Sequence, residues 1–224
     1  MSDDFYASLF GAAYSTYMER PRLSRLISRV FWGGDTAPYY ASMAAVGELS
    51  PGETVVDCPC GAGPALRVLP ADRSIRYVGV DLSPSMLRRA RKRAAARGLR
   101  ELEFLAAEAA ALPLADGSAD LFLSFWGLHC FSDPAAAIAE TARVLAPGGR
   151  LVGASFVRGA DTLRQRLLVR PYAGGFGPIC TQAEIEMLLN SMGFESIAAE
   201  RSGPFLYFTA GKPTGSAELR SESA

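Results

Sequence analysis

The chain has 224 residues, of which 49% are hydrophobic, so it can bury a substantial core as one compact unit. Its 23 basic side chains balance 23 acidic ones, which leaves no net charge to attract nucleic acid or an anionic membrane. It opens without a basic segment followed by an apolar run, and no stretch is apolar for long enough to span a bilayer, so we expect a cytoplasmic protein with neither of these partners.

The first 49 residues are rich in aromatic side chains. Phe10, Tyr14 and Tyr17 lie three to four residues apart, which is the spacing of one helical face. Such a stripe either packs onto a sheet or lines an apolar pocket, and the sequence leaves both open. We predict a helical lid over residues 1–49.

A strand, a tight turn and a helix start follow at residues 55–64. Two valines run into Asp57, and the turn after it contains Gly61 and Gly63 before Pro64. Valine suits a buried parallel strand, glycine lets the backbone approach a ligand, and proline suits a first helical position. The free N–H groups of such a turn can bind a polar ligand.

Two further acids stand at the ends of later predicted strands. Asp81 ends the strand at residues 77–81, at a distance from the turn that suits one βαβ unit, and its carboxylate can accept from two ribose hydroxyls. Leu66 replaces the third glycine of a dinucleotide turn, so we expect a ligand without phosphates. Glu108 follows the third strand, and in a parallel sheet these acids and Asp57 would face one crevice.

The rest of the chain alternates strands and helices. Further strands are predicted at 102–105, 121–125 and 151–155, helices at 84–96, 134–145 and 182–193, and a closing hairpin at 194–199 and 205–210. This alternation predicts an α/β fold, a doubly wound and mostly parallel sheet in which the final hairpin adds an antiparallel strand.

The four cysteines are too few and too scattered to frame a disulfide scaffold, so we expect reduced thiols. Cys58 and Cys60 form a C-x-C pair, which would hold a metal only with two further ligands. His129 is the only histidine of the chain, and no metal site is predicted.

Five segments, taken in this order, resemble class I S-adenosylmethionine-dependent methyltransferases of the small-molecule type related to ubiquinone and menaquinone biosynthesis. The segments are residues 55–63, 79–83, 112–120, Leu128-His129 with Asp133-Pro134, and 143–149. The resemblance implies a seven-stranded Rossmann-like methyltransferase fold and an enzyme that uses S-adenosylmethionine and releases S-adenosylhomocysteine. It implies a cofactor-binding domain at 50–213, with a substrate-side insertion at 156–179 and a flexible tail at 214–224.

The resemblance also implies a function for individual residues. Asp57 and the backbone from Gly61 to Gly63 would surround the methionine part of the cofactor, Asp81 would hold the ribose, and Glu108 would accept from the adenine amine. The full set of implied cofactor contacts is Tyr14, Tyr17, Asp57, Cys58, Pro59, Gly61, Gly63, Asp81, Leu82, Met86, Glu108, Ala109, Ser124 and Phe125.

Two positions depart from the family pattern. Pro59 stands where the family usually has glycine, which removes one N–H from the turn. Glu108 stands where aspartate is commoner, so the adenine would sit further out. Both departures affect how tightly the cofactor is held.

Methyl transfer from a sulfonium is an in-line displacement that mainly requires an aligned acceptor and the exclusion of water. His129, Tyr17 and Glu19 are candidates for a general base toward a hydroxyl acceptor. The aromatic lid suggests a small aromatic or apolar acceptor, with methylation at oxygen, nitrogen or carbon all open. A nicotinamide-dependent oxidoreductase with the same sheet and a non-catalytic ligand-binding relative are the alternatives.

Overall fold

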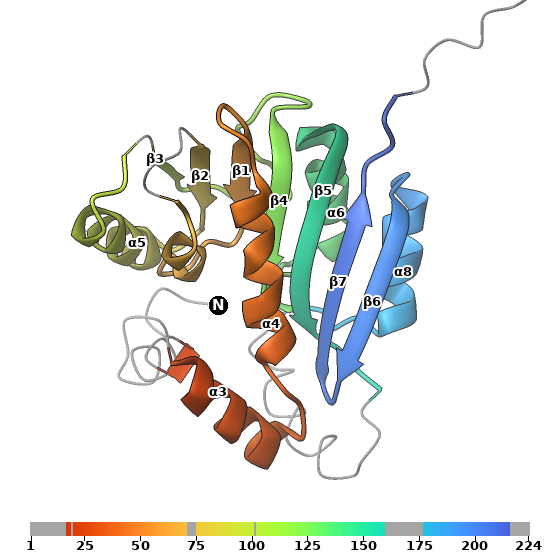
Figure 1. Ribbon diagram of the computed structural model, residues 1–224. Coiled ribbons are helices and arrows are strands. Elements are labelled where there is room, and N and C mark those ends of the chain that lie inside the picture. The colour runs from red at the N-terminus through yellow and green to blue at the C-terminus, as the bar shows by residue number, and fades with distance from the viewer. Residues whose placement is uncertain (1–16, 19, 71–74, 101, 160–176, 216–224) are drawn as a thin grey trace, which may run out of the picture.

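Seven strands form one sheet in the order β3-β2-β1-β4-β5-β7-β6 (Figure 1). All neighbouring strands run parallel except β7, which is antiparallel to both β5 and β6. The strands are β1 (Thr54–Asp57), β2 (Arg76–Val80), β3 (Leu102–Leu105), β4 (Ala119–Phe125), β5 (Leu145–Phe156), β6 (Glu195–Ser202) and β7 (Phe205–Gly211). The predicted doubly wound sheet with an antiparallel C-terminal hairpin is confirmed.

The computed structural model describes residues 17–215 except for 19, 71–74, 101 and 160–176. The described helices are α3 (Pro21–Ile27), η1 (Ser28–Trp32), α4 (Ala37–Ser42), η2 (Met43–Glu48), η3 (Pro64–Arg67), α5 (Pro84–Ala96), η4 (Leu128–Cys130), α6 (Pro134–Val144) and α8 (Gln182–Ser191). None of these helices is both long and apolar enough to cross a membrane.

The helices cover both faces of the sheet, and strand alternation divides the core between them. On the first face, Val55 and Tyr77 pack with α4, η3 and α5. On the second face, Val56 and Val78 pack with α6 and α8 (Figure 1). Strand order reverses between β1 and β4, so the carboxyl end of β1 lies at the point where such sheets bind ligands.

Side-chain caps fix where the long helices begin. The Ser83 side chain accepts a hydrogen bond from the N–H of Met86 at 3.3 Å, and the Asp133 side chain accepts from the N–H of Ala136 at 2.9 Å. Thr181 opens α8 with a complete capping box. These side chains satisfy N–H groups that would otherwise lack a partner at each helix start.

One strand differs in length from the prediction, whereas the helix after the turn is the short 3₁₀ segment η3, which ends at Arg67 before Pro70. Strand β5 begins at Leu145 rather than at residue 151. Gly148 and Gly149 belong to this strand because both bond to the backbone of Lys212. Lys212 donates its N–H to the carbonyl of Gly149 at 2.8 Å, and its carbonyl accepts from the N–H of Gly148 at 3.0 Å.

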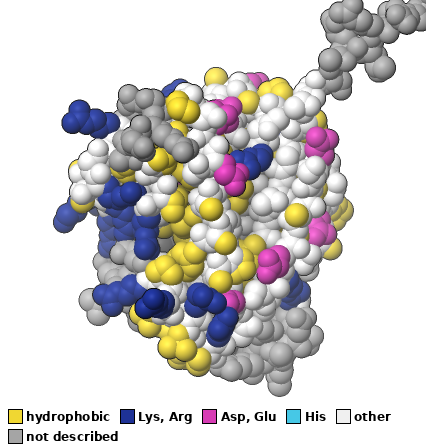
Figure 2. Space-filling model, in the orientation of Figure 1, with side chains coloured by type: hydrophobic (Ala, Val, Ile, Leu, Met, Phe, Trp, Pro, Cys, Tyr) yellow, Lys and Arg dark blue, Asp and Glu magenta, His cyan; other side chains and the backbone are white. Residues whose placement is uncertain are grey.

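The described part of the N-terminal segment docks against the β6–β7 hairpin. The backbone N–H of Asp35 donates to Ser202 Oγ at 2.8 Å, and the Tyr207 hydroxyl donates to the carbonyl of Asp35 at 2.8 Å. Burial alone would raise the pKa of Asp35, but hydrogen bonds from Arg25, the Ala37 N–H and Arg29 outweigh it and lower that pKa to about 2. On the face shown in Figure 2, apolar and basic side chains lie side by side over α3.

Candidate functional site

Asp57 ends β1 at the carboxyl edge of the sheet and is almost completely buried. The Tyr77 hydroxyl donates a hydrogen bond of 2.6 Å to Asp57 Oδ2. Burial raises the pKa of Asp57 to about 7; the bond from Tyr77 opposes this rise, and the nearby charge of Asp81 adds to it. A buried carboxyl group that titrates near neutral pH is a feature of functional sites.

The turn after Asp57 is held by backbone hydrogen bonds to neighbouring strands. Cys58 donates its N–H to the carbonyl of Leu123 at 2.9 Å, and Cys60 donates to the carbonyl of Val80 at 2.8 Å. Gly61 has a φ of +52°, and a Cβ there would meet nothing within 4 Å. Backbone hydrogen bonds therefore fix the start of the turn, and open space adjoins its backbone at Gly61.

Asp81 connects this turn to α5. Its Oδ2 accepts from the N–H of Gly61 and its Oδ1 accepts from the N–H of Ser83, each at 2.8 Å. The next residue, Leu82, is 66% exposed. Met86 is buried in the first turn of α5. The structure thus brings Asp57, the glycine turn and Asp81 together, as predicted from their strand ends.

Glu108 and Ala109 lie in the loop after β3. Glu108 is exposed, and its Oε1 accepts from Ser132 Oγ at 3.2 Å. Ala109 is buried and packs with the second face of the core. Glu108 therefore stands at the rim of the sheet with a solvent-accessible carboxylate, whereas Asp57 lies inside it.

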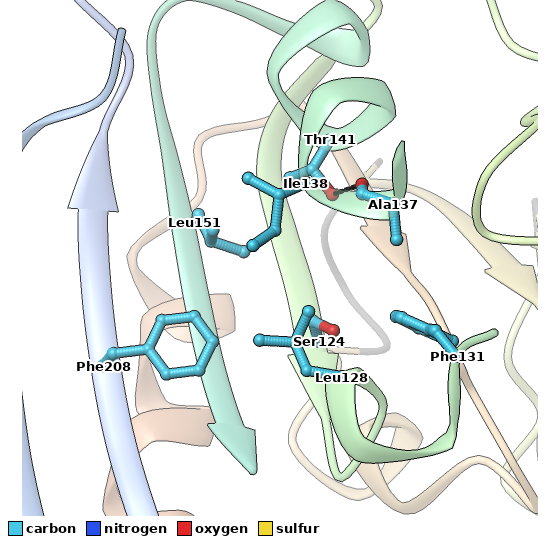
Figure 3. A pocket seen from close by; sticks show the side chains of 8 residues that line it. All are labelled: Ser124, Leu128, Phe131, Ala137, Ile138, Thr141, Leu151 and Phe208. Carbon is cyan, nitrogen blue, oxygen red and sulfur yellow. Dashed lines mark hydrogen bonds between the residues drawn. The ribbon is translucent and has the colours of Figure 1, made fainter. Parts of the chain in front are cut away.

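Ser124 and Phe125 point to opposite faces of β4. Ser124 lines a small apolar cavity between the sheet and α6 (Figure 3). Phe125 faces the other way and packs edge-on against Tyr39 of α4, with ring centroids 5.2 Å apart. The remaining lining residues of the cavity are Leu128, Phe131, Ala137, Ile138, Thr141, Leu151 and Phe208. Because Asp57 shares its face with Tyr77, Ser124 lies on the face opposite Asp57.

His129 is fully buried in η4. Its Nδ1 accepts a hydrogen bond of 3.2 Å from the backbone N–H of Phe156 and lies 3.2 Å from Ser155 Oγ. Burial lowers the pKa of His129 to about 3, so the imidazole is neutral at physiological pH. This setting differs from the one expected of a general base, because the nitrogen that could take a proton already accepts from the backbone.

The two tyrosines implied at the cofactor differ in what the structure describes. Tyr14 lies outside the described residues, as does the Glu19 side chain. The Tyr17 hydroxyl bonds to the Ser28 hydroxyl and donates to the carbonyl of Ser24 at 3.4 Å. Tyr17 therefore holds α3 and η1 together within the N-terminal segment.

The thiols of the turn are buried and inert. Burial raises the pKa of Cys58 and Cys60, and the charges of Asp57 and Asp81 raise both further. Neutral thiols are poor nucleophiles and poor metal ligands. Within the described residues, no three side chains of the metal-binding types are grouped so that they could hold an ion.

An aromatic cluster at the carboxyl end of β4 was not anticipated from the sequence. Trp126 has a φ of +60° and packs against Tyr39, Phe156 and Phe205, with ring centroids 5.5, 5.7 and 5.3 Å away. Among the described residues, its indole Nε1 is buried without a hydrogen-bond partner. The one feature of the sequence that could have indicated this cluster is the position of Trp126 directly after a predicted strand, at the carboxyl edge of the sheet.

Residues 56–153 match the family model described as "Methyltransferase domain". The demethylmenaquinone methyltransferase of Thermus thermophilus is 41% identical over 128 residues, which cover 54% of this chain and 58% of the relative. The chain spans little more than half the length of the curated relatives it matches first. The matched region contains the Asp57 turn, Asp81 and Trp126.

Solved structures share the fold. The [4+2]-cyclase SpnF is 25% identical, with a TM-score of 0.64 over 77% of this chain and 81% of that one. A phosphoethanolamine N-methyltransferase of Haemonchus contortus, solved with S-adenosylhomocysteine, is 17% identical, with a TM-score of 0.68 over 78% of this chain and 52% of that one. The chain therefore has a Rossmann-like fold, within which residues 56–153 match a methyltransferase domain.

Proposed function

From the premise that residues 56–153 form a methyltransferase domain, we propose that this protein transfers a methyl group from S-adenosylmethionine to a small apolar or aromatic acceptor. The observation that carries the proposal is the frame made by Asp57, Gly61 and Asp81 at the reversal of strand order. A small-molecule acceptor is supported by the aromatic residues beside this frame.

The frame fits an adenosyl group. Asp81 follows β2 at the carboxyl edge of the sheet, and each of its oxygens accepts one backbone N–H at 2.8 Å. A carboxylate at this place is the acceptor that ribose hydroxyls require. Leu82 exposes an apolar side chain that an adenine ring would cover, and Glu108 offers a carboxylate to the adenine amine. The open side of Gly61 lets a ligand approach the backbone.

The charge of the frame favours a cationic ligand. Asp57 and Asp81 repel each other, and this repulsion contributes to the raised pKa of Asp57. The cofactor brings a sulfonium and an ammonium group, whose positive charges would relieve that repulsion. A phosphate-bearing nucleotide would increase it.

When bound beside Asp57, Gly61 and Asp81, the cofactor would supply an activated methyl group on a sulfonium. An electron pair of the acceptor would take this methyl group in line with the carbon–sulfur bond, leaving a neutral thioether, and the proton lost by the acceptor would pass to solvent. The protein's contribution is to align the acceptor and exclude water. The rings of Tyr39, Trp126, Phe156 and Phe205 supply an apolar wall beside the end of β4. The Trp126 Nε1–H would donate to a polar atom of the acceptor.

Other functions fit the structure less well. A nicotinamide dinucleotide needs a third glycine where Leu66 is fully buried against Gly63. The likeness to a [4+2]-cyclase shows that this fold also occurs in a protein named for another reaction. The test must therefore separate cofactor binding from catalysis.

Isothermal titration provides the first test. S-adenosylhomocysteine should bind and NAD should not, and Asp81→Ala should weaken binding at least about tenfold because a charge-assisted hydrogen bond is lost. Glu200→Gln removes an exposed acid from strand β6 and serves as the matched control with unchanged affinity. Equal affinity in wild type and Asp81→Ala, or preference for NAD, would refute the proposed cofactor site.

A second experiment tests the reaction itself. Purified protein with a methyl-labelled donor should transfer label to members of a panel of phenols, quinones and amines. The kinship with a demethylmenaquinone methyltransferase supports placing quinones first in that panel. Binding of the donor without transfer to any acceptor would favour a non-catalytic or differently catalytic relative.

A further inference from the structure

The helix formed by α3 and η1 buries polar side chains and exposes apolar ones. Its buried side carries Ser24 and Ser28, both with no exposed surface. Its solvent side carries Leu26, Val30 and Phe31, which are 62%, 53% and 57% exposed. A surface helix of a globular protein normally places its apolar residues against the core and its polar residues in water.

Hydrogen bonds hold the polar side inward. Ser24 Oγ lies 2.9 Å from Thr36 Oγ1, and Ser28 Oγ bonds to the Tyr17 hydroxyl. The backbone N–H of Ser24 also donates to the carbonyl of Arg20 at 2.8 Å. Rotating the helix to bury its apolar side chains would leave these hydroxyls without their partners. The hydrogen bonds therefore keep the apolar face outward.

Arginines flank the apolar face. Arg22, Arg25 and Arg29 follow one another at intervals of three and four residues, so they form one ridge along the helix. Arg25 and Arg29 pair with Asp35 yet keep 45% and 60% of their side-chain surface exposed. Figure 2 shows apolar and basic side chains next to each other in this region of the surface.

We propose that the outer face of α3 and η1 docks onto the surface of an anionic lipid bilayer. An apolar stripe bordered by arginine is the pattern of a helix that lies in the membrane interface, with its apolar side chains at the acyl boundary and its cations at lipid phosphates. The arginines of this face complement phosphate groups. The balanced net charge of the chain conceals this local excess of arginine.

Docking would place the membrane beside the aromatic cluster. Trp32 ends η1 and packs edge-on against Phe156, with ring centroids 5.4 Å apart. Phe156 in turn contacts Trp126. An apolar molecule leaving the bilayer at η1 would therefore meet aromatic surface first, whereas the docking itself does not depend on the proposed reaction.

The test is sedimentation of the full chain with lipid vesicles, without any methyl donor. Wild-type protein should bind phosphatidylglycerol-containing vesicles more tightly than phosphatidylcholine vesicles, and added salt should weaken the binding. The double variant Leu26→Gln and Phe31→Gln should lose at least about tenfold in affinity, because two apolar side chains no longer enter the interface. Arg22→Glu should weaken binding to the anionic vesicles alone.

The control removes two exposed apolar side chains elsewhere on the surface. Met187 and Met192 of the α8 region are 63% and 36% exposed, and their replacement by glutamine should leave vesicle binding unchanged. All substitutions are on the surface, and thermal unfolding will verify that each variant is folded. Absence of wild-type binding, or equal binding by the Leu26 and Phe31 variant, overturns the proposal. Self-association that this variant abolishes without lipid would assign the face to a second copy and also overturn it.

Discussion

Asp57 and His129 are both buried and ionisable, but their neighbours give them different properties. Asp57 receives a hydroxyl hydrogen bond from Tyr77, which supplies a donor near a turn where Pro59 lacks an N–H. His129 receives a backbone N–H at Nδ1, so its other ring nitrogen carries the proton. Asp57 can respond to a bound cation, whereas His129 is set to remain neutral.

The imidazole of His129 should show no titration between about pH 5 and pH 8. Burial lowers its pKa to about 3, well below this range. The chain has one histidine, so untagged protein gives a single imidazole signal to follow by NMR as the pH changes. A midpoint near the ordinary histidine value would contradict the burial of the ring and restore His129 as a candidate base.

The positions of several candidate site residues were predictable because their signals are local. Asp57, Gly61 and Asp81 stand at strand ends and turns, where residue type reflects backbone geometry. The packing of Trp126 was not predictable, because its contact with Phe205 comes from a hairpin about eighty residues later. That separation is a property of the tertiary fold.

At the scale of elements, the N-terminal segment depends on a close backbone approach to the final hairpin. A Cβ on Gly34 would lie 2.3 Å from the carbonyl oxygen of Ser202 and 2.8 Å from the ring of Phe205. Only glycine fits there without moving backbone. The position of α3, and with it the docking face, therefore depends on Gly34.

Gly34→Ala should lower the free energy of unfolding by about 1–3 kcal/mol, because the added methyl forces the segment away from the hairpin. Hydrogen exchange should show faster opening of α3 and α4 than in wild type. Gly47→Ala is the matched control, since a Cβ at Gly47 meets nothing within 4 Å. Equal losses in the two variants would mean that the close approach does not hold the N-terminal segment against the hairpin.

Helix starts were predictable from sequence, but the orientation of α3 was not. Three N-cap residues mark helix starts, because each side chain accepts a hydrogen bond from the backbone N–H three residues later: Ser83, Asp133 and Thr181. The apolar spacing of Leu23, Leu26 and Val30 would ordinarily indicate a buried face. The structure buries the serines instead, because their partners Thr36 and Tyr17 come from other parts of the segment.

At the scale of the whole molecule, alternating strands and helices predicted the sheet and the edge at which its strand-end acids lie. The parallel pairing of β1 with β2 places Asp57 and Asp81 together, although 23 residues separate them in the sequence. The balanced total charge predicted no membrane partner, but a sum over 224 residues cannot show where arginines gather. The proposed docking face revises that expectation, because arginines gather beside exposed apolar side chains on α3 and η1.

The stability of the whole protein should depend on the protonation of Asp57. The folded state holds this proton up to about pH 7, whereas an unfolded aspartate releases it near the ordinary value of 3.8. The folded protein therefore binds more protons between these limits, and its free energy of unfolding falls as the pH rises through the window, by about 1.4 kcal/mol for each unit of pKa displacement at most.

Asp57→Asn removes the titration and tests this directly. Urea unfolding should find the variant more stable than wild type above about pH 7, with the difference shrinking as the pH falls toward 4, while its affinity for S-adenosylhomocysteine drops. Tyr77→Phe removes the bond that lowers the pKa of Asp57, so its stability should keep falling to a higher pH than in wild type. If the pH profiles of wild type and Asp57→Asn run parallel, the carboxylate is already ionised in the folded protein, and the electrostatic argument for a cationic ligand loses its basis.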